Sequence, residues 1–204
     1  MGAILCGSFE KESETTMATT VQTQPAAQQY EASVDAAIQR LKELKINFLA
    51  VDFDCTILSI HTGGRWHGTH QELLQHVRPY FPPLLERALK ERISVAIVTF
   101  SPQVDLVRSV LDSHLGHEAS RKIPIRAGGQ FSYNGGGMRD GKQAHMASAV
   151  EELETTGVEI TKATSLLIDD DGKNVRTALR DGVRAIWLNP DQPDQLLTDI
   201  ARLV

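Results

Sequence analysis

The chain has 204 residues, of which 41% are hydrophobic and 23% are charged, and its formal net charge is −5. This length and composition are typical of one globular domain with a short extension, not of a disordered or fibrous protein. The 26 Asp and Glu residues outnumber the 21 Lys and Arg residues, which argues against a nucleic-acid backbone as the main partner. No run of about 18 apolar residues occurs, so we expect no membrane-spanning helix.

Residues 1–27 are predicted to form a flexible tail, because they show no apolar periodicity and are rich in Ser, Thr, Gln and Glu. The tail begins with MGAILC. This start resembles an N-myristoylation signal, in which Gly2 is acylated after the initiator Met is removed, although Cys6 stands where Ser or Thr is usual. One myristoyl chain anchors a protein only marginally, so Cys6 is the candidate for a second, palmitoyl chain. The alternative is that Gly2 is simply the second residue.

The cysteines also bear on the cellular setting. Cys6 and Cys55 are the two cysteines of the chain, too few and too far apart for a disulfide framework or a zinc cluster. Four of the seven histidines lie between His61 and His76, but they lack the H-E-x-x-H spacing of a zinc site. We therefore expect an intracellular protein, at the cytoplasmic face of a membrane if it is acylated and in the cytoplasm otherwise.

Residues 28–204 are predicted to form one α/β domain. Apolar residues recur at helical spacing over residues 28–44, and residues 46–51 include an apolar run typical of a buried strand. The further predicted strands are 93–99, 123–126, 165–168 and 183–188, and the further predicted helices are 81–91, 102–115, 142–155, 173–181 and 193–203. This alternation predicts a mostly parallel central sheet with helices on both faces. Ligands of such sheets bind outside the carboxyl ends of the strands.

The first and second predicted strands end in polar residues that are candidates for catalysis or phosphate binding. Asp52 and Asp54 follow the first strand, and two acids at a buried strand end repel each other unless a cation or a proton compensates. One of them can act as a nucleophile and the other as an acid and base. Thr99 ends the second strand, where its hydroxyl either holds a phosphate with nearby backbone N–H groups or caps the next helix.

Two further motifs are ambiguous when each is taken singly. Lys142 begins a predicted helix, where the helix dipole disfavours a cation, so it is either functional or a surface lysine. Asp169, Asp170 and Asp171 directly follow the strand 165–168. They form either a site or the acid-rich first turn of a helix.

In their order and spacing, these motifs resemble the haloacid dehalogenase (HAD) superfamily, and within it the phosphatases. The matching residues are Asp52, Asp54 and Thr56 for the first motif, Thr99 for the second, Lys142 for the third, and Asp169, Asp170 and Asn174 for the fourth. The resemblance covers residues 46–190 and implies a Rossmann-like HAD fold. The intervals 54–99 and 99–142 leave no room for a sizeable cap domain.

The resemblance implies a Mg²⁺-dependent phosphomonoester phosphatase. Asp52 would attack phosphorus and form an aspartyl phosphate, while Asp54 would protonate the leaving group and then activate water. Thr99 and Lys142 would bind the transferring phosphoryl group. The presence of Asp54 favours phosphate chemistry over carbon–halogen cleavage, which needs no acid at that position.

The family's Mg²⁺ ligands map onto oxygen donors of this chain. They would be the Asp52 carboxylate, the Asp54 carbonyl oxygen and Asp170, with Asp169 in support. Because Asp171 follows directly, the register of this motif stays open by one residue.

An open site suits a large substrate, such as a phosphoprotein or a lipid headgroup, unless a neighbouring chain closes it. Residues 59–67 lie where the family has a flap, and His61, Arg65 and Trp66 are candidate substrate contacts. The alternative is a surface loop whose Trp66 packs inward.

Three other functions are compatible with parts of the sequence. A catalytically silent, membrane-tethered binding module with the same fold is suggested by the tail. A phosphotransferase would use the same residues. A P-loop enzyme is suggested by the sequence GGMRDGK at 136–142, but Gln143 stands where that motif needs Ser or Thr.

Overall fold

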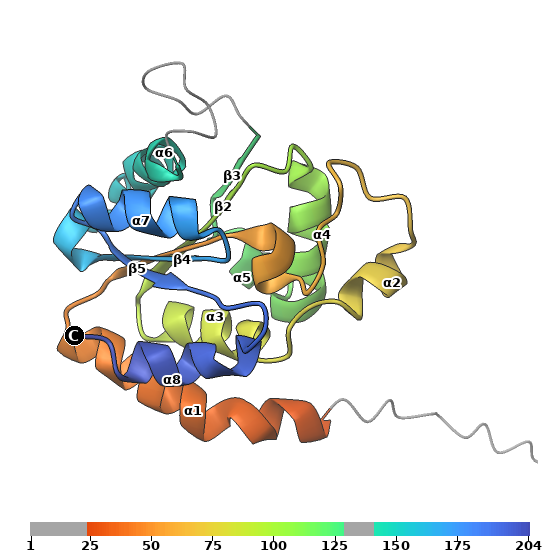
Figure 1. Cartoon of the computed structure of the whole chain (residues 1–204), viewed down its shortest axis with the longest axis horizontal. Coiled ribbons are helices and arrows are strands. Elements are labelled where there is room, and N and C mark those ends of the chain that lie inside the picture. Colours follow the sequence, from red (N-terminus) through yellow and green to blue (C-terminus); the bar gives the residue numbers. More distant parts are fainter. Residues whose placement is uncertain (1–23, 129–140) are drawn as a thin grey trace, which may run out of the picture.

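Five short apolar segments pair into one sheet in a computed structural model of the chain (Figure 1). The structure describes residues 24–128 and 141–204, with side chains from residue 30 onward. The strands are β1 Phe48–Val51, β2 Ser94–Thr99, β3 Ile125–Ala127, β4 Ser165–Asp169 and β5 Arg184–Trp187. Their order is β3-β2-β1-β4-β5, and every neighbouring pair is parallel. The predicted α/β class and Rossmann-like parallel sheet are thus confirmed.

Helices connect the strands. They are α1 Gln24–Glu43, α2 His70–Leu74, α3 Phe81–Lys90, α4 Val104–Leu115, α5 His117–Ser120, α6 Gln143–Glu154, α7 Gly172–Arg180 and α8 Leu196–Ala201. The first of them begins at Gln24, earlier than the predicted residue 28, because a proline at position 25 fits a first turn, where its missing N–H is not needed. The short α2 and α5 were not predicted, since a helix of one turn shows no periodicity.

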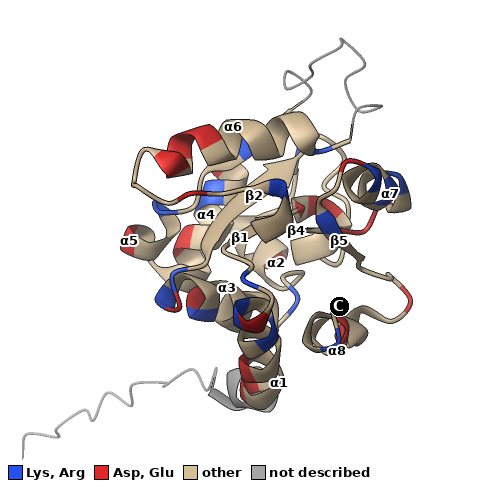
Figure 2. Ribbon diagram, turned by 90° about the vertical axis from the view of Figure 1, so that its left-hand side faces the viewer, with Lys and Arg blue, Asp and Glu red and all other residues tan. Residues whose placement is uncertain are grey.

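The sheet separates two apolar cores, because successive side chains of a strand point to opposite faces. Leu49 and Val51 of β1 face a core built with α1, α3, α4 and α8. Phe48 and Ala50 face a second core, built with α6 and α7. Burial on both faces explains why β1 and β2 are apolar and carry no charged residue (Figure 2).

The strand register decides which residues meet at the carboxyl edge of the sheet. Val51 of β1 lies opposite Ile97 of β2 and Ile168 of β4. The Asp52 N–H continues this ladder by donating to Ile168 O at 2.9 Å. Asp52 and Asp169 are therefore neighbours in space although they lie far apart in the sequence.

Within the residues that the structure describes, none of the helices combines the length and the hydropathy needed to cross a bilayer. The candidate lipidation sites Gly2 and Cys6 lie outside the described residues, so acylation of the tail stays a prediction.

Candidate active site

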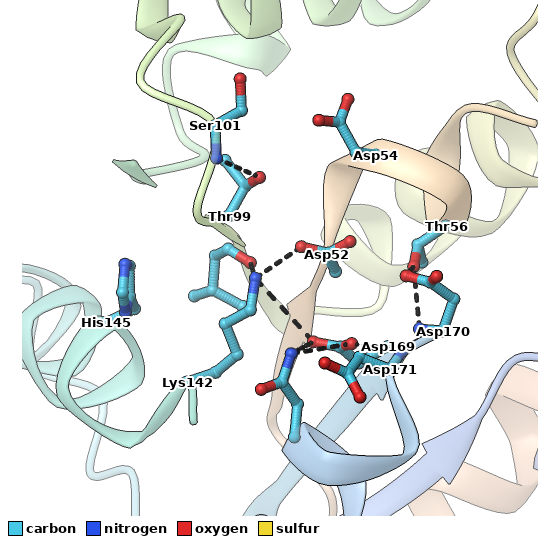
Figure 3. Close-up of polar contacts among 12 residues, drawn as sticks. Asp52, Asp54, Thr56, Thr99, Ser101, Lys142, His145, Asp169, Asp170 and Asp171 are labelled. Carbon is cyan, nitrogen blue, oxygen red and sulfur yellow. Dashed lines mark hydrogen bonds and ion pairs between the residues drawn. The ribbon is translucent and has the colours of Figure 1, made fainter. Parts of the chain in front are cut away.

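Three carboxylates converge where β1 and β4 end (Figure 3). Oxygen atoms of Asp52, Asp169 and Asp170 all lie within 4.8 Å of one another, and together they can hold a metal ion. Asp52 and Asp169 are 5% and 1% exposed, so water screens their repulsion poorly. Such a group is stable only with bound protons, a nearby cation or a metal ion.

The pKa values of these acids reflect the same burial and mutual repulsion. Burial, and next the charge of Asp52, raise the pKa of Asp169 to about 7. The pKa of Asp170 is raised by the same two causes in the same order. Near neutral pH, Asp169 therefore keeps its proton for much of the time unless positive charge beyond that of Lys142 lowers its pKa.

Neighbouring polar groups fix the orientation of the acids from β4. The Asn174 side-chain amide donates to both carboxylate oxygens of Asp169, at 3.1 and 3.0 Å. The Thr56 hydroxyl lies 3.1 Å from Asp170 Oδ1 and also accepts from the Asp170 N–H at 3.1 Å. Asp171 lies outside the acidic group and caps α7 by accepting from the Lys173 N–H at 2.8 Å. Of the three consecutive acids, Asp169 and Asp170 therefore belong to the acidic group and Asp171 does not.

Lys142 brings one positive charge to the acids. Its ammonium lies 2.6 Å from Asp52 Oδ1 and 3.9 Å from Asp169 Oδ2, and it donates to Val98 O at 2.8 Å. The same nitrogen is 4.3 Å from the centroid of the Phe100 ring. The side chain is thus buried among the strand ends instead of lying on the surface beside the start of α6. One ammonium does not balance the charge of three carboxylates, so the group can accept further positive charge.

Asp54 follows Asp52 through an irregular turn, Phe53–Ile57, in which Cys55 has a left-handed φ of 57°. This turn directs the Asp54 carboxylate away from Asp169 and Asp170 (Figure 3). The Thr62 hydroxyl and N–H donate to its two oxygens at 3.0 and 3.3 Å. Burial raises the pKa of Asp54, and the two Thr62 contacts oppose that shift. Asp54 thus lies beside Asp52 in a different electrostatic environment.

Thr99 lies at the end of β2 with its hydroxyl accepting from the Ser101 N–H at 3.1 Å. It does not cap the following helix, because the residue that precedes α4 is Gln103. The hydroxyl instead shapes the loop after β2, whose residues 99–102 border the site.

A cavity of about 480 Å³ opens above these residues. Its lining brings together most of the side chains that the sequence singled out: Asp52, Asp54, Thr99, Lys142, Asp169, Asp170, Asn174 and His61. Arg65 and Trp66, the other candidate substrate contacts, are not among the described residues that line it. Trp66 is half-buried and packs against the core, and its ring meets that of His76 in a T-shaped arrangement with the centroids 6.4 Å apart.

Two residues of the site, Thr62 and Gln103, were not predicted from the sequence. Thr62 holds Asp54, and Gln103 donates to the Thr62 hydroxyl at 3.0 Å. Both lie in irregular segments, where no periodic pattern predicts which side chains meet.

Comparison of the chain with protein families, curated proteins and solved structures found no match.

Proposed function

We propose that the protein is a Mg²⁺-dependent phosphomonoester phosphatase of the HAD type, which works through an aspartyl phosphate on Asp52. The observation that carries this proposal is the buried contact of Lys142 with Asp52 inside a group of three carboxylates. These residues lie far apart in the sequence but meet at the carboxyl ends of the strands, where ligands of parallel sheets bind. Their order along the chain is that of the HAD motifs.

Asp52 is the proposed nucleophile. Its carboxylate oxygen forms a bond to phosphorus while the bond from phosphorus to the leaving oxygen breaks. Lys142, with its ammonium 2.6 Å from Asp52 Oδ1, faces the negative charge that spreads over the phosphoryl oxygens. Thr99 and the backbone of the loop after β2 complete the proposed phosphoryl cradle.

Asp54 is the proposed acid and base. Its raised pKa keeps a proton available closer to neutral pH than in an ordinary aspartic acid. That proton passes to the leaving oxygen in the first step. In the second step Asp54 accepts a proton from the water whose oxygen attacks phosphorus, which releases phosphate and restores Asp52.

The residues present fit Mg²⁺, which prefers oxygen ligands and retains several waters. Asp52, Asp169 and Asp170 offer three carboxylates, and we propose the Asp54 carbonyl oxygen as a further ligand. When bound, Mg²⁺ would supply positive charge that offsets the acids and the phosphoryl oxygens.

A large substrate is supported by the surroundings of the cavity. Between Asp54 and Thr99 the chain forms a loop, α2 and α3, and after Thr99 the described residues form α4, α5 and β3. In these described segments, α3, α4 and β3 pack into the domain, as expected of a capless enzyme. We therefore favour a phosphoprotein or lipid headgroup as substrate, reached at a membrane if the tail is acylated.

Hydrolysis of an aryl phosphate, with Mg²⁺ or with a chelator, tests the proposal. We expect Mg²⁺-dependent turnover that falls by at least about 10³-fold in Asp52→Asn, because removing a nucleophile costs at least this much. Circular dichroism of the variant controls for folding. A parent protein without turnover would contradict the proposal, and retained binding of a phosphate mimic would then indicate a silent binding module. Transfer of phosphate to an added alcohol would indicate a phosphotransferase.

A further inference from the structure

The flap, residues 59–67, is tied to the domain on both sides. At its base the Ser59 N–H donates to His76 O at 2.8 Å. Just beyond its other end, His70 Nε2 lies 2.9 Å from the Ser113 hydroxyl on α4. Between these anchors, Gln103 holds the flap by contacting Thr62 and Trp66. The flap therefore packs against the residue that precedes α4.

The hydrogen bonds of Gln103 have a fixed direction. Its Oε1 accepts from the Trp66 backbone N–H at 2.6 Å, and a backbone N–H can only donate. This contact decides which end of the amide is oxygen, so the opposite end, Nε2, donates to the Thr62 hydroxyl at 3.0 Å. The one proton of that hydroxyl is then left for Asp54 Oδ2, 3.0 Å away.

Asp54 is thus held by two donors from one residue. The Thr62 hydroxyl reaches Oδ2, and the Thr62 N–H reaches Oδ1 at 3.3 Å. Thr62 and Asp54 are 5% and 8% exposed, so water competes little for these bonds. Two donors on two oxygens oppose rotation of the carboxyl group about its last bond.

We propose that Thr62 and Gln103 are positioning residues, which orient Asp54 for proton transfer only while the flap is docked. The inference rests on the proposed function, since it assigns a purpose to the orientation of the proposed acid. Thr62 and Trp66 lie in the same stretch of the flap, so undocking breaks the Trp66–Gln103, Gln103–Thr62 and Thr62–Asp54 bonds together. Proton transfer is thereby coupled to closure of the flap over the phosphate.

Substitutions of Thr62 test the hydroxyl with two kinds of substrate. A nitrophenyl phosphate has a good leaving group that needs little protonation, whereas an alkyl phosphate depends on the acid. We expect Thr62→Val to lower kcat/KM for the alkyl ester by about 10²-fold, the lower end of what general acids contribute, with a much smaller loss for the nitrophenyl ester. Thr62→Ser, which keeps the hydroxyl, should stay close to the parent with both.

Gln103→Glu tests the direction of the hydrogen bonds that lead from Trp66 through Gln103 and Thr62 to Asp54. Glutamate still accepts from the Trp66 N–H but cannot donate to Thr62, so the hydroxyl proton is drawn away from Asp54. We expect the same selective loss with the alkyl ester. Ser113→Ala is the matched control, because it removes only the His70–Ser113 contact beside the flap and leaves the hydrogen bonds between Gln103, Thr62 and Asp54 intact. It should leave the ratio between the two substrates unchanged.

Amide hydrogen exchange gives a readout that does not need turnover. Gln103→Ala should speed exchange at the Trp66 N–H, which loses its acceptor, relative to the parent. Unchanged exchange, equal losses with both substrates, or equal effects of Thr62→Val and Thr62→Ser would each overturn the positioning role while the phosphatase proposal stands. A parent that hydrolyses neither ester would overturn both.

Discussion

The acids at the end of β4 differ in their partners, and these partners separate the proposed metal ligand Asp170 from the helix cap Asp171. Asp170 belongs to the acidic group and contacts Thr56. Asp171 accepts from the backbone of α7, a contact that asparagine can also make. The neighbouring residues are therefore expected to respond differently to the same substitution.

We predict that Asp170→Asn weakens Mg²⁺ binding by at least about tenfold, since even residues behind the ligands typically contribute that much. Asp171→Asn should bind Mg²⁺ like the parent. Titration calorimetry measures both affinities. Trp187 fluorescence gives a second signal, because the Trp187 indole N–H donates to Asp170 O at 2.6 Å. Equal affinities in the two variants would show that the register of the site is wrong.

Which single residues of the site could be predicted from the sequence depends on whether they lie beside a regular element or in an irregular loop. Asp52, Asp54, Thr99, Lys142, Asp169 and Asp170 each stand next to an apolar strand or a helix start, and all line one cavity. Thr62 and Gln103 escaped prediction because the path of an irregular loop decides their contacts. Trp66 packs against the core, which was the alternative to a substrate contact, because an apolar ring in a glycine-rich loop gains by burial.

At the scale of elements, the segments with strong apolar periodicity were predictable and the irregular ones were not. The helix expected from Val34, Ala37, Ile38 and Leu41 is α1, and all four are buried. The turn Phe53–Ile57 was not predictable, because a left-handed φ is unusual for a residue such as Cys55. Yet this turn is what gives Asp52 and Asp54 separate surroundings.

The contact of α1 with the core carries a stability prediction. Leu41 is fully buried in the core that α1 shares with α3 and α8. We expect Leu41→Ala to lower the free energy of unfolding by about 2–5 kcal/mol, through lost burial and the cavity left behind. Gln39→Ala, on the exposed face of α1, should change it by less than about 0.5 kcal/mol. Urea unfolding followed by circular dichroism measures both. Similar effects in the two variants would argue against the packing of α1.

At the scale of the whole molecule, the acidic group links folding to pH and, through the proposed metal site, to Mg²⁺. The pKa of Asp169 is about 7 in the folded protein and about 3.9 in an unfolded chain. Between these values the folded state keeps a proton that the unfolded state loses, so this group lowers stability as pH rises through that window. Buried His145 acts in the opposite direction, because burial lowers its pKa and stability falls as pH drops below about 6.5.

Asp169→Asn removes the charge of the acid at the cost of one of the two hydrogen bonds from Asn174. In the presence of chelator we expect the variant to have a higher Tm than the parent at pH 8, with the difference shrinking toward pH 4. The gain is on the order of a few kcal/mol, since each pKa unit corresponds to about 1.4 kcal/mol. Saturating Mg²⁺ should raise the Tm of the parent at pH 8 and that of the variant much less. A higher Tm for the parent than for the variant at pH 8 without metal would contradict the prediction that repulsion within the acidic group destabilises the folded protein.

The proposed reaction passes through a covalent phosphoryl group on Asp52, and trapping this group is its most direct test. In Asp54→Asn, water is not activated, so a nitrophenyl phosphate should leave phosphate bound to the enzyme after the leaving group departs. We predict that acid quenching followed by peptide mass spectrometry finds the phosphoryl group on Asp52, and that hydroxylamine removes it. Release of nitrophenol and phosphate by this variant in equal amounts from the first turnover, with no phosphoryl group on Asp52, would contradict the account.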